Sequence, residues 1–140
     1  MNESIPTLLG KKVLIVEDDT FLHTLLSDKL TELRTQGLEV FPTMNAAEAL
    51  ETARKEHPDL ILLDIAIPGQ NGFEVLEELR KEDTFKKTPA IFLTNMAQDS
   101  DKKRAGELGA VGYFVKANTP LEEISGEIRR ILSDAPSQSI

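Results

Sequence analysis

The sequence contains no cysteine, which excludes disulfide bonds and thiolate metal sites. It has no apolar run near the ~20 residues that cross a bilayer, and its first residues lack the apolar core of a signal peptide. Basic residues are in the minority, with 16 Lys and Arg against 24 Asp and Glu, so the formal net charge is −8. This charge repels phosphate backbones. We therefore expect a cytoplasmic protein that binds neither membranes nor nucleic acid directly.

The 140 residues fit one domain, along which strand-like apolar runs alternate with helical patterns. This alternation predicts an α/β fold, a parallel sheet with helices on both faces. The expected strands cover residues 13–16, 38–41, 59–63, 90–93 and 111–115, and the expected helices about 20–36, 45–56, 73–81, 99–108 and 119–132. We expect residues 12–133 to form the domain, with short flexible tails at 1–11 and 134–140.

Polar residues stand where four of the apolar runs end: Glu17-Asp18, Asp64, Thr94 and Lys116. The carboxyl ends of parallel strands meet at one edge of an open α/β sheet, where ligands bind. Carboxylates gathered there repel one another, and a bound Mg²⁺ removes that repulsion because it prefers oxygen ligands. The alternative is that these acids only cap the next helix through its dipole. Asp19 suits that role, whereas the acids that directly leave the apolar strand favour a metal site.

Asp64 is the candidate nucleophile, because a carboxylate can attack phosphorus and form an acyl phosphate. Mg²⁺ would hold one phosphoryl oxygen, the Lys116 ammonium a second, and the Thr94 hydroxyl would donate to a third. Taken singly, a threonine at a strand end is usually a cap and a lysine there is usually solvated. Their combination in this order indicates a site for a hard cation and a phosphoryl group.

The chain resembles the receiver domain of bacterial two-component response regulators over about residues 12–132. The segments that carry the resemblance are VLIVEDD (13–19), DLILLD (59–64), PGQNGFEVL (68–76), IFLT (91–94) and GAVGYFVK (109–116). The resemblance implies a doubly wound five-stranded parallel sheet in the order 2-1-3-4-5, the flavodoxin-like order of chemotaxis regulators.

The resemblance also implies roles for the acids. Asp64 would be the phosphoacceptor, and Glu17, Asp18 and Asp64 would bind Mg²⁺ together with the backbone carbonyl of Ala66. The partners would be a histidine kinase or histidine phosphotransfer protein, and a downstream effector protein. Such a domain is not an enzyme but a phosphoacceptor that assists its own Mg²⁺-dependent phosphorylation and dephosphorylation.

Thr94 and Tyr113 resemble the switch pair of the family. On phosphorylation the hydroxyl would move to the phosphoryl group and the ring would turn inward, reshaping the surface of the fourth helix, fifth strand and last helix for a partner. The alternative is that Tyr113 is an ordinary core or rim aromatic at a strand end. His23 and His57 are alternative phosphoryl carriers, but their positions favour surface residues.

The chain departs from the family pattern at two places. Ala117 follows Lys116 where the family usually has a proline, often with a cis bond, and a non-proline cis bond costs about 2.5–4 kcal/mol. We expect either a trans bond with a shifted loop or a strained cis bond. Asn95 replaces a small residue, and its amide either bonds the phosphoryl group or narrows the entrance. Ala66 and Met96 offer no side-chain hydrogen bond to an attacking water, so we expect slow to intermediate self-dephosphorylation.

Three other functions are alternatives to this one. The two departures leave open a pseudo-receiver scaffold that takes no phosphate. A Mg²⁺-dependent phosphatase with an aspartyl nucleophile often needs a second acid two residues later, where this chain has Ala66. A flavin carrier needs a Ser/Thr/Gly-rich phosphate loop after the first strand, where this chain has acids. Only about eight residues follow Leu132, so we expect a stand-alone receiver without an effector domain.

Overall fold

The computed structural model of the chain describes residues 8–133, so residues 1–7 of the expected tail at 1–11 and the whole expected tail at 134–140 lie outside the described residues. The elements in chain order are β1 (Lys12–Val16), α1 (Thr20–Lys29), α2 (Thr31–Thr35), β2 (Glu39–Thr43), α3 (Ala46–Glu56), β3 (Leu60–Leu63), α4 (Gly72–Arg80), η1 (Asp83–Phe85), β4 (Ala90–Thr94), α5 (Asp99–Glu107), β5 (Gly112–Val115), η2 (Lys116–Asn118) and α6 (Leu121–Ser133). Leu8 is fully buried against the sheet, so the packed part begins before the expected boundary at residue 12.

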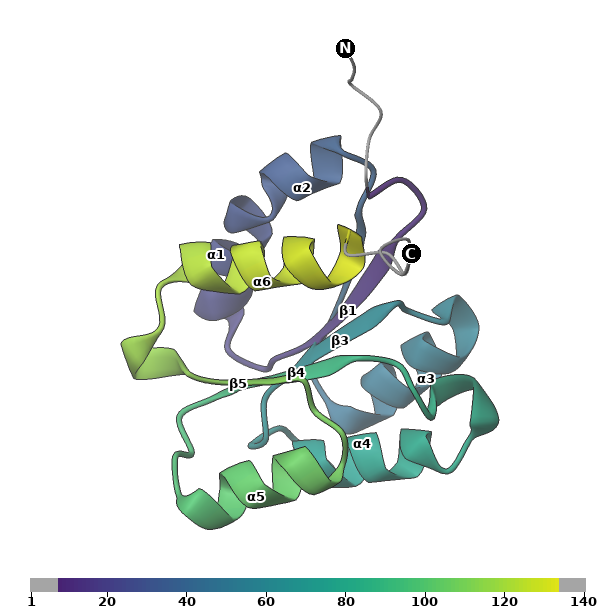
Figure 1. Cartoon of the computed structure of the whole chain (residues 1–140), viewed down its shortest axis with the longest axis vertical. Helices are drawn as coiled ribbons and strands as arrows, with labels where there is room; N and C mark the ends of the chain where they lie inside the picture. The colour runs from purple at the N-terminus through teal and green to yellow at the C-terminus, as the bar shows by residue number, and fades with distance from the viewer. Residues whose placement is uncertain (1–7, 134–140) are drawn as a thin grey trace, which may run out of the picture.

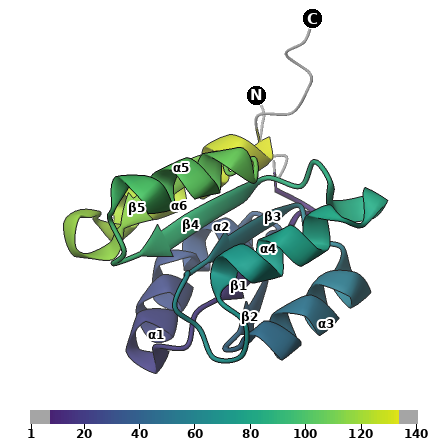
Figure 2. The ribbon, with the colours of Figure 1, turned by 90° about the horizontal axis from the view of Figure 1, so that it is seen from below.

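The five strands form one sheet in the order β2-β1-β3-β4-β5, and every neighbouring pair is parallel. This confirms the expected doubly wound topology. Helices α1, α2 and α6 lie on one side of the sheet and α3, α4 and α5 on the other (Figure 1). In the turned view α4 crosses in front of the strands (Figure 2).

The central strands are apolar throughout because helices cover both of their faces. In β1, Leu14 and Val16 pack toward α3 and α4, and Val13 and Ile15 pack toward α1 and α6. All four side chains are at most 2% exposed. Within residues 8–133, no helix has the length and apolar character that crossing a bilayer requires.

The first helix is shorter than the expected 20–36, because it breaks at Leu30 between α1 and α2. The Thr31 hydroxyl donates to the Ser27 carbonyl at 3.2 Å. Serine and threonine side chains that bond back to the preceding turn bend helices. Leu26, Leu30 and Leu33 nevertheless stay buried, so the apolar stripe that predicted one helix runs across both pieces.

The second strand also differs from its prediction, since it continues through Pro42 to Thr43 instead of ending at Phe41. Pro42 is paired in register with Ile15 of β1. Proline lacks the N–H of a ladder hydrogen bond and is tolerated in edge strands. Because β2 has a neighbour on one side only, the proline does not end the strand.

Candidate functional site

The polar residues that follow the strands meet at the carboxyl edge of the sheet. Glu17 and Asp18 follow β1, Asp64 follows β3, Thr94 ends β4 and Lys116 follows β5. These four strands are consecutive neighbours in the sheet, so their ends lie side by side. The structure therefore brings the ends of these four strands, and the polar residues that they carry, to one edge of the sheet.

Three carboxylates form a compact cluster at this edge. One oxygen each of Glu17, Asp18 and Asp64 lies within 4.8 Å of the other two. Glu17 and Asp64 are only 2% and 5% exposed, whereas Asp18 is exposed. Carboxylate oxygens with one side open to solvent suit a hard divalent cation that keeps part of its water shell. The donor set therefore fits a divalent metal site.

Lys116 bridges two of these acids. Its Nζ lies 2.7 Å from Asp64 Oδ2 and 2.8 Å from Glu17 Oε1. Burial alone lowers the pKa of Lys116, but its hydrogen bonds to both carboxylates and their negative charges outweigh this and raise the pKa. The ammonium is thus held in its charged form between the two carboxylates.

For the pKa of Glu17, in contrast, the effect of burial outweighs that of the hydrogen bonds. Burial raises the pKa of its carboxyl group, and the charge of Asp64 adds to this effect. The bonds from Lys116 and from the Asp19 N–H, the latter at 3.0 Å to Glu17 Oε2, offset the rise only in part. A cation in the cluster would favour the ionised carboxylate.

Both oxygens of Asp64 have partners within the chain. Its Oδ1 accepts the N–H of Ile65 at 2.6 Å and of Ala66 at 3.4 Å, and its Oδ2 accepts from Lys116. The loop then folds back so closely that a Cβ at Gly72 would lie 2.1 Å from the Asp64 carbonyl oxygen. Only glycine fits this approach, and the tight loop fixes the direction of the Asp64 side chain.

The capping alternative applies to Asp19 alone. Its Oδ1 accepts the N–H groups of Phe21 and Leu22 at 2.9 and 3.2 Å, which caps α1. Glu17 and Asp18 instead contribute to the carboxylate cluster. Neighbouring acids in one short segment therefore have different structural tasks.

Thr94 and Tyr113 both contact the backbone of Met96. Thr94 is 1% exposed, and its Oγ1 accepts the Met96 N–H at 3.2 Å. The Tyr113 hydroxyl donates to the Met96 carbonyl, and its ring packs on Phe92 with centroids 6.2 Å apart. Burial raises the pKa of Tyr113, and the charges of Asp101 and Asp64 add to the rise. The ring is already half-buried in this structure.

The two departures from the family pattern contact each other. The Lys116–Ala117 peptide bond is trans, the first of the two expected outcomes. The Ala117 N–H donates to Asn95 Oδ1 at 3.2 Å, across the loops that follow β5 and β4. The two roles expected for Asn95, at the phosphoryl group or at the entrance, do not include this contact, because no local signal links residues 22 positions apart.

The histidines lie outside the carboxylate cluster. His23, expected at the surface, is half-buried, and its Nε2 lies 3.0 Å from the Thr43 carbonyl, which also accepts the Glu17 N–H. His57 is exposed, as expected, and stacks on Phe85 at the opposite edge of the sheet.

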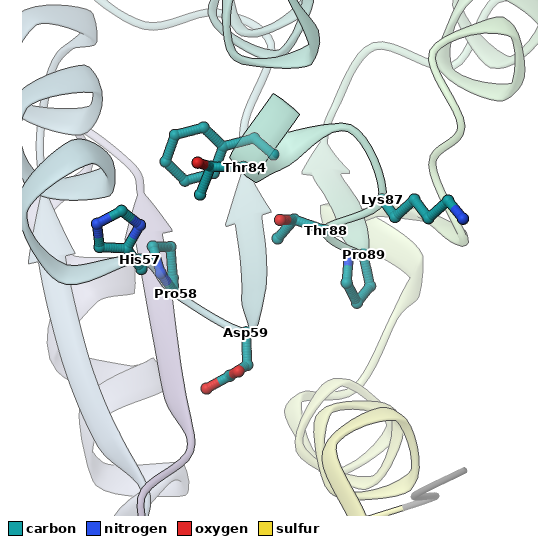
Figure 3. A pocket seen from close by; sticks show the side chains of 8 residues that line it. His57, Pro58, Asp59, Thr84, Lys87, Thr88 and Pro89 are labelled. Carbon is teal, nitrogen blue, oxygen red and sulfur yellow. The ribbon is translucent and has the colours of Figure 1, made fainter. Parts of the chain in front are cut away.

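His57 lines a pocket at the amino ends of β3 and β4 (Figure 3). The figure shows its polar side chains diverging, with Lys87 and Asp59 pointing to different sides. The Asp59 carboxylate accepts the Lys12 N–H at 2.8 Å. Because these groups do not converge, the pocket lacks the geometry of a second reactive site.

Comparison with known proteins agrees with this geometry. The profile of the family described as "Response regulator receiver domain" matches residues 13–128. The alkaline phosphatase synthesis transcriptional regulatory protein PhoP of Bacillus subtilis is 35% identical over 124 residues, which cover 89% of this chain and 49% of that protein. The chain thus spans about half the length of this relative.

Solved structures show the same fold. The phosphorylated cyanobacterial phytochrome response regulator RcpA superposes with a TM-score of 0.79 and 30% identity, covering 89% of this chain and 96% of that one. The Mn²⁺-bound form of response regulator Rcp1 gives a TM-score of 0.74 and 26% identity, covering 86% and 92%. The fold, the carboxylate cluster and the profile match lead to one conclusion: the chain belongs to the response regulator receiver domain family.

Proposed function

We propose that this protein accepts a phosphoryl group on Asp64 from a histidine kinase or histidine phosphotransfer protein and then binds a downstream effector protein. The general role of the family is phosphorylation-dependent signalling, with the domain as phosphoacceptor. The observation that carries the proposal is the bridge from Lys116 to two buried acids, at 2.7 and 2.8 Å, within a carboxylate cluster open on one side. Such an arrangement both holds a cation and presents a nucleophilic carboxylate.

In the proposed transfer, a carboxylate oxygen of Asp64 forms a bond to phosphorus while the bond between phosphorus and the donor histidine nitrogen breaks. The bond electrons leave with the imidazole, and the product is an acyl phosphate. Mg²⁺, held by Glu17, Asp18, Asp64 and the Ala66 carbonyl, would supply charge neutralisation. Lys116 offers its ammonium to a phosphoryl oxygen, and positioning of this kind does most of the work in phosphoryl transfer.

Thr94 is suited to respond to the new phosphoryl group. Its Oγ1 acts as an acceptor toward Met96, which leaves the hydroxyl proton available for donation. A phosphoryl group on Asp64 would attract this proton, and the segment around Met96 would shift with it. Because Tyr113 donates to the Met96 carbonyl, the shift would reach the surface of α5, β5 and α6. This surface is the proposed binding site for the effector.

The remaining parts of the proposal follow from the same residues. Residues 12–133 would be the receiver unit, acting in the cytoplasm through protein partners rather than through nucleic acid. Ala66 and Met96 lack water-orienting side chains, which supports slow to intermediate self-dephosphorylation. The position of Lys116 argues against the pseudo-receiver scaffold, because the trans bond to Ala117 does not draw the ammonium away from Asp64.

Intact-mass spectrometry after incubation with Mg²⁺ and acetyl phosphate tests the function. We expect a gain of one phosphoryl group that disappears in Asp64→Asn and after chelation of the metal. Asp83→Asn, which changes an exposed acid away from the cluster, is the matched control and should be phosphorylated normally. An unmodified wild type that still binds Mg²⁺ would favour the scaffold function instead.

A further inference from the structure

One hydrogen bond joins the loop after β4 to the loop after β5. The N–H of Ala117 donates to Asn95 Oδ1 at 3.2 Å. Ala117 lies in η2, whose preceding residue makes no side-chain cap. The first N–H groups of a helix have no acceptor within their own turn. Asn95 therefore supplies from another loop the acceptor that this short helix lacks.

We propose that Asn95 is a positioning residue for Lys116, which it holds through the N–H of Ala117. The inference rests on the proposed phosphoacceptor function, in which Lys116 supplies a positive charge to the phosphoryl group. Lys116 directly precedes Ala117, so the hydrogen bond fixes the peptide that carries the lysine. Small displacements of a positioning group greatly lower the rate of phosphoryl transfer.

The chemistry of residue 117 makes this bond specific to a chain without proline there. Proline has no N–H and restricts its backbone through the ring instead. In this chain the side chain of Asn95 restrains the loop after Lys116 from outside, in addition to the local bond from the Thr119 hydroxyl to the Val115 carbonyl at 2.9 Å. Alanine at position 117 has no ring but carries a backbone N–H, which donates to Asn95 Oδ1.

The segment that carries Asn95 is itself held on both sides. Thr94 Oγ1 accepts the Met96 N–H, and Tyr113 donates to the Met96 carbonyl. Three consecutive residues, Thr94 at the end of β4 and the two that follow it, thus take part in contacts that join this segment to itself, to β5 and to η2. If the segment that begins at Thr94 moved, Asn95 would move with it and would displace Lys116. Thr94 and Lys116 would therefore shift together.

A double-mutant cycle tests the inference, with Asn95→Ala, Ala117→Pro and their combination. Loss of the bond should speed hydrogen exchange of the residue 117 amide in Asn95→Ala, measured by NMR without any phosphodonor. The maximal rate of phosphorylation by acetyl phosphate at saturating Mg²⁺ should fall by about two- to tenfold, the effect of one hydrogen bond. Mg²⁺ affinity should stay within about twofold, since Asn95 is not a metal ligand.

The double variant should be phosphorylated at the rate of the slower single variant or faster, because both substitutions remove the same hydrogen bond. Asn95→Asp keeps an acceptor oxygen and should preserve slow exchange at residue 117. Asn118→Ala, the matched control, removes an exposed amide from the same loop and should leave exchange and rate unchanged.

Two results would overturn the inference. One is an Asn95→Ala protein that is phosphorylated as fast as the wild type. The other is that Asn95→Ala slows phosphorylation of the Ala117→Pro protein by the same factor as it slows that of the wild type. A wild type that takes no phosphate would reject the proposed function and the positioning role with it. In that case the exchange measurement would still report whether the contact exists, so the two failures are distinguishable.

Discussion

Replacing Lys116 with methionine removes the ammonium that contacts two buried carboxylates while keeping a side chain of similar length. At an effective dielectric of about 20, a charge pair at this separation attracts by about 6 kcal/mol. Desolvation of the charges offsets part of this, and removing one partner of a buried pair costs about 3–5 kcal/mol in practice. The side chain of Lys116 is 18% exposed and the side chains of Glu17 and Asp64 are 3% and 6% exposed, so the buried case applies.

We expect Lys116→Met to lower the free energy of unfolding by about 3–5 kcal/mol without metal, a large share of the roughly 5–15 kcal/mol of a typical domain. The assay is urea unfolding followed by circular dichroism, in chelator and then in Mg²⁺. Mg²⁺ should stabilise the variant more than the wild type, because the cation replaces the missing positive charge. The cost should shrink as the pH falls toward the raised pKa of Glu17, because protonation removes one of the repelling charges.

Lys29→Met is the control, since Lys29 forms an exposed ion pair with Glu122 at 3.1 Å. Surface pairs of this kind contribute little to stability, because water and salt screen their attraction. The reasoning would be refuted if Lys116→Met cost no more than this control in chelator. A loss that Mg²⁺ did not relieve would equally contradict it, because the loss would then not come from carboxylate repulsion.

The remaining predictions concern other parts of the fold. Gly72→Ala should lower the free energy of unfolding by at least about 2 kcal/mol, measured in urea, because its Cβ would lie 2.1 Å from the Asp64 carbonyl oxygen. Gly126→Ala, where a Cβ meets open space within α6, should instead raise it by roughly 0.5–1 kcal/mol, and equal effects at the two glycines would contradict the steric argument. Tyr113 is the only tyrosine, so ultraviolet absorbance should show its phenol titrating above the ordinary 10.0, and Asp64→Asn should lower that pKa by removing a negative charge. The unfolded chain then loses this proton first, so stability should decline as the pH rises above 10.0, and a pKa of 10.0 or less would contradict the burial of the ring. Arg80→Met should cost about 2–3 kcal/mol in the same unfolding assay, because the guanidinium donates to three backbone carbonyls, and a loss below about 0.5 kcal/mol would show that water replaces it.

Much of the fold was predictable because its signals are local. The apolar run from Val13 to Val16 is continuous since helices cover both faces of β1, and the alternation of such runs with helical stripes predicted the sheet. The candidate site was predictable for the same reason, since polar residues such as Asp64 directly follow strands whose ends must meet. The resemblance supplied the strand order, which periodicity alone leaves open.

Other features could not be predicted, because they depend on competing contacts in three dimensions. The break at Leu30 arises where a threonine hydroxyl takes part in the helical bonding, although the apolar stripe continues. The proline in β2 is allowed because that strand is at the edge of the sheet. Leu8 is buried although its neighbours in sequence suggested a tail.

Residue type and hydrophobic period can be read along the chain, so they are enough to predict which chemical groups stand at the carboxyl edge. Which of those groups are partners depends on how the whole chain packs. Lys116 bridges both buried acids, and Asn95 meets the N–H of Ala117 across 22 residues. A hydrogen bond needs its atoms within about 3 Å, and the packing of the whole sheet, rather than any local pattern, sets separations on that scale.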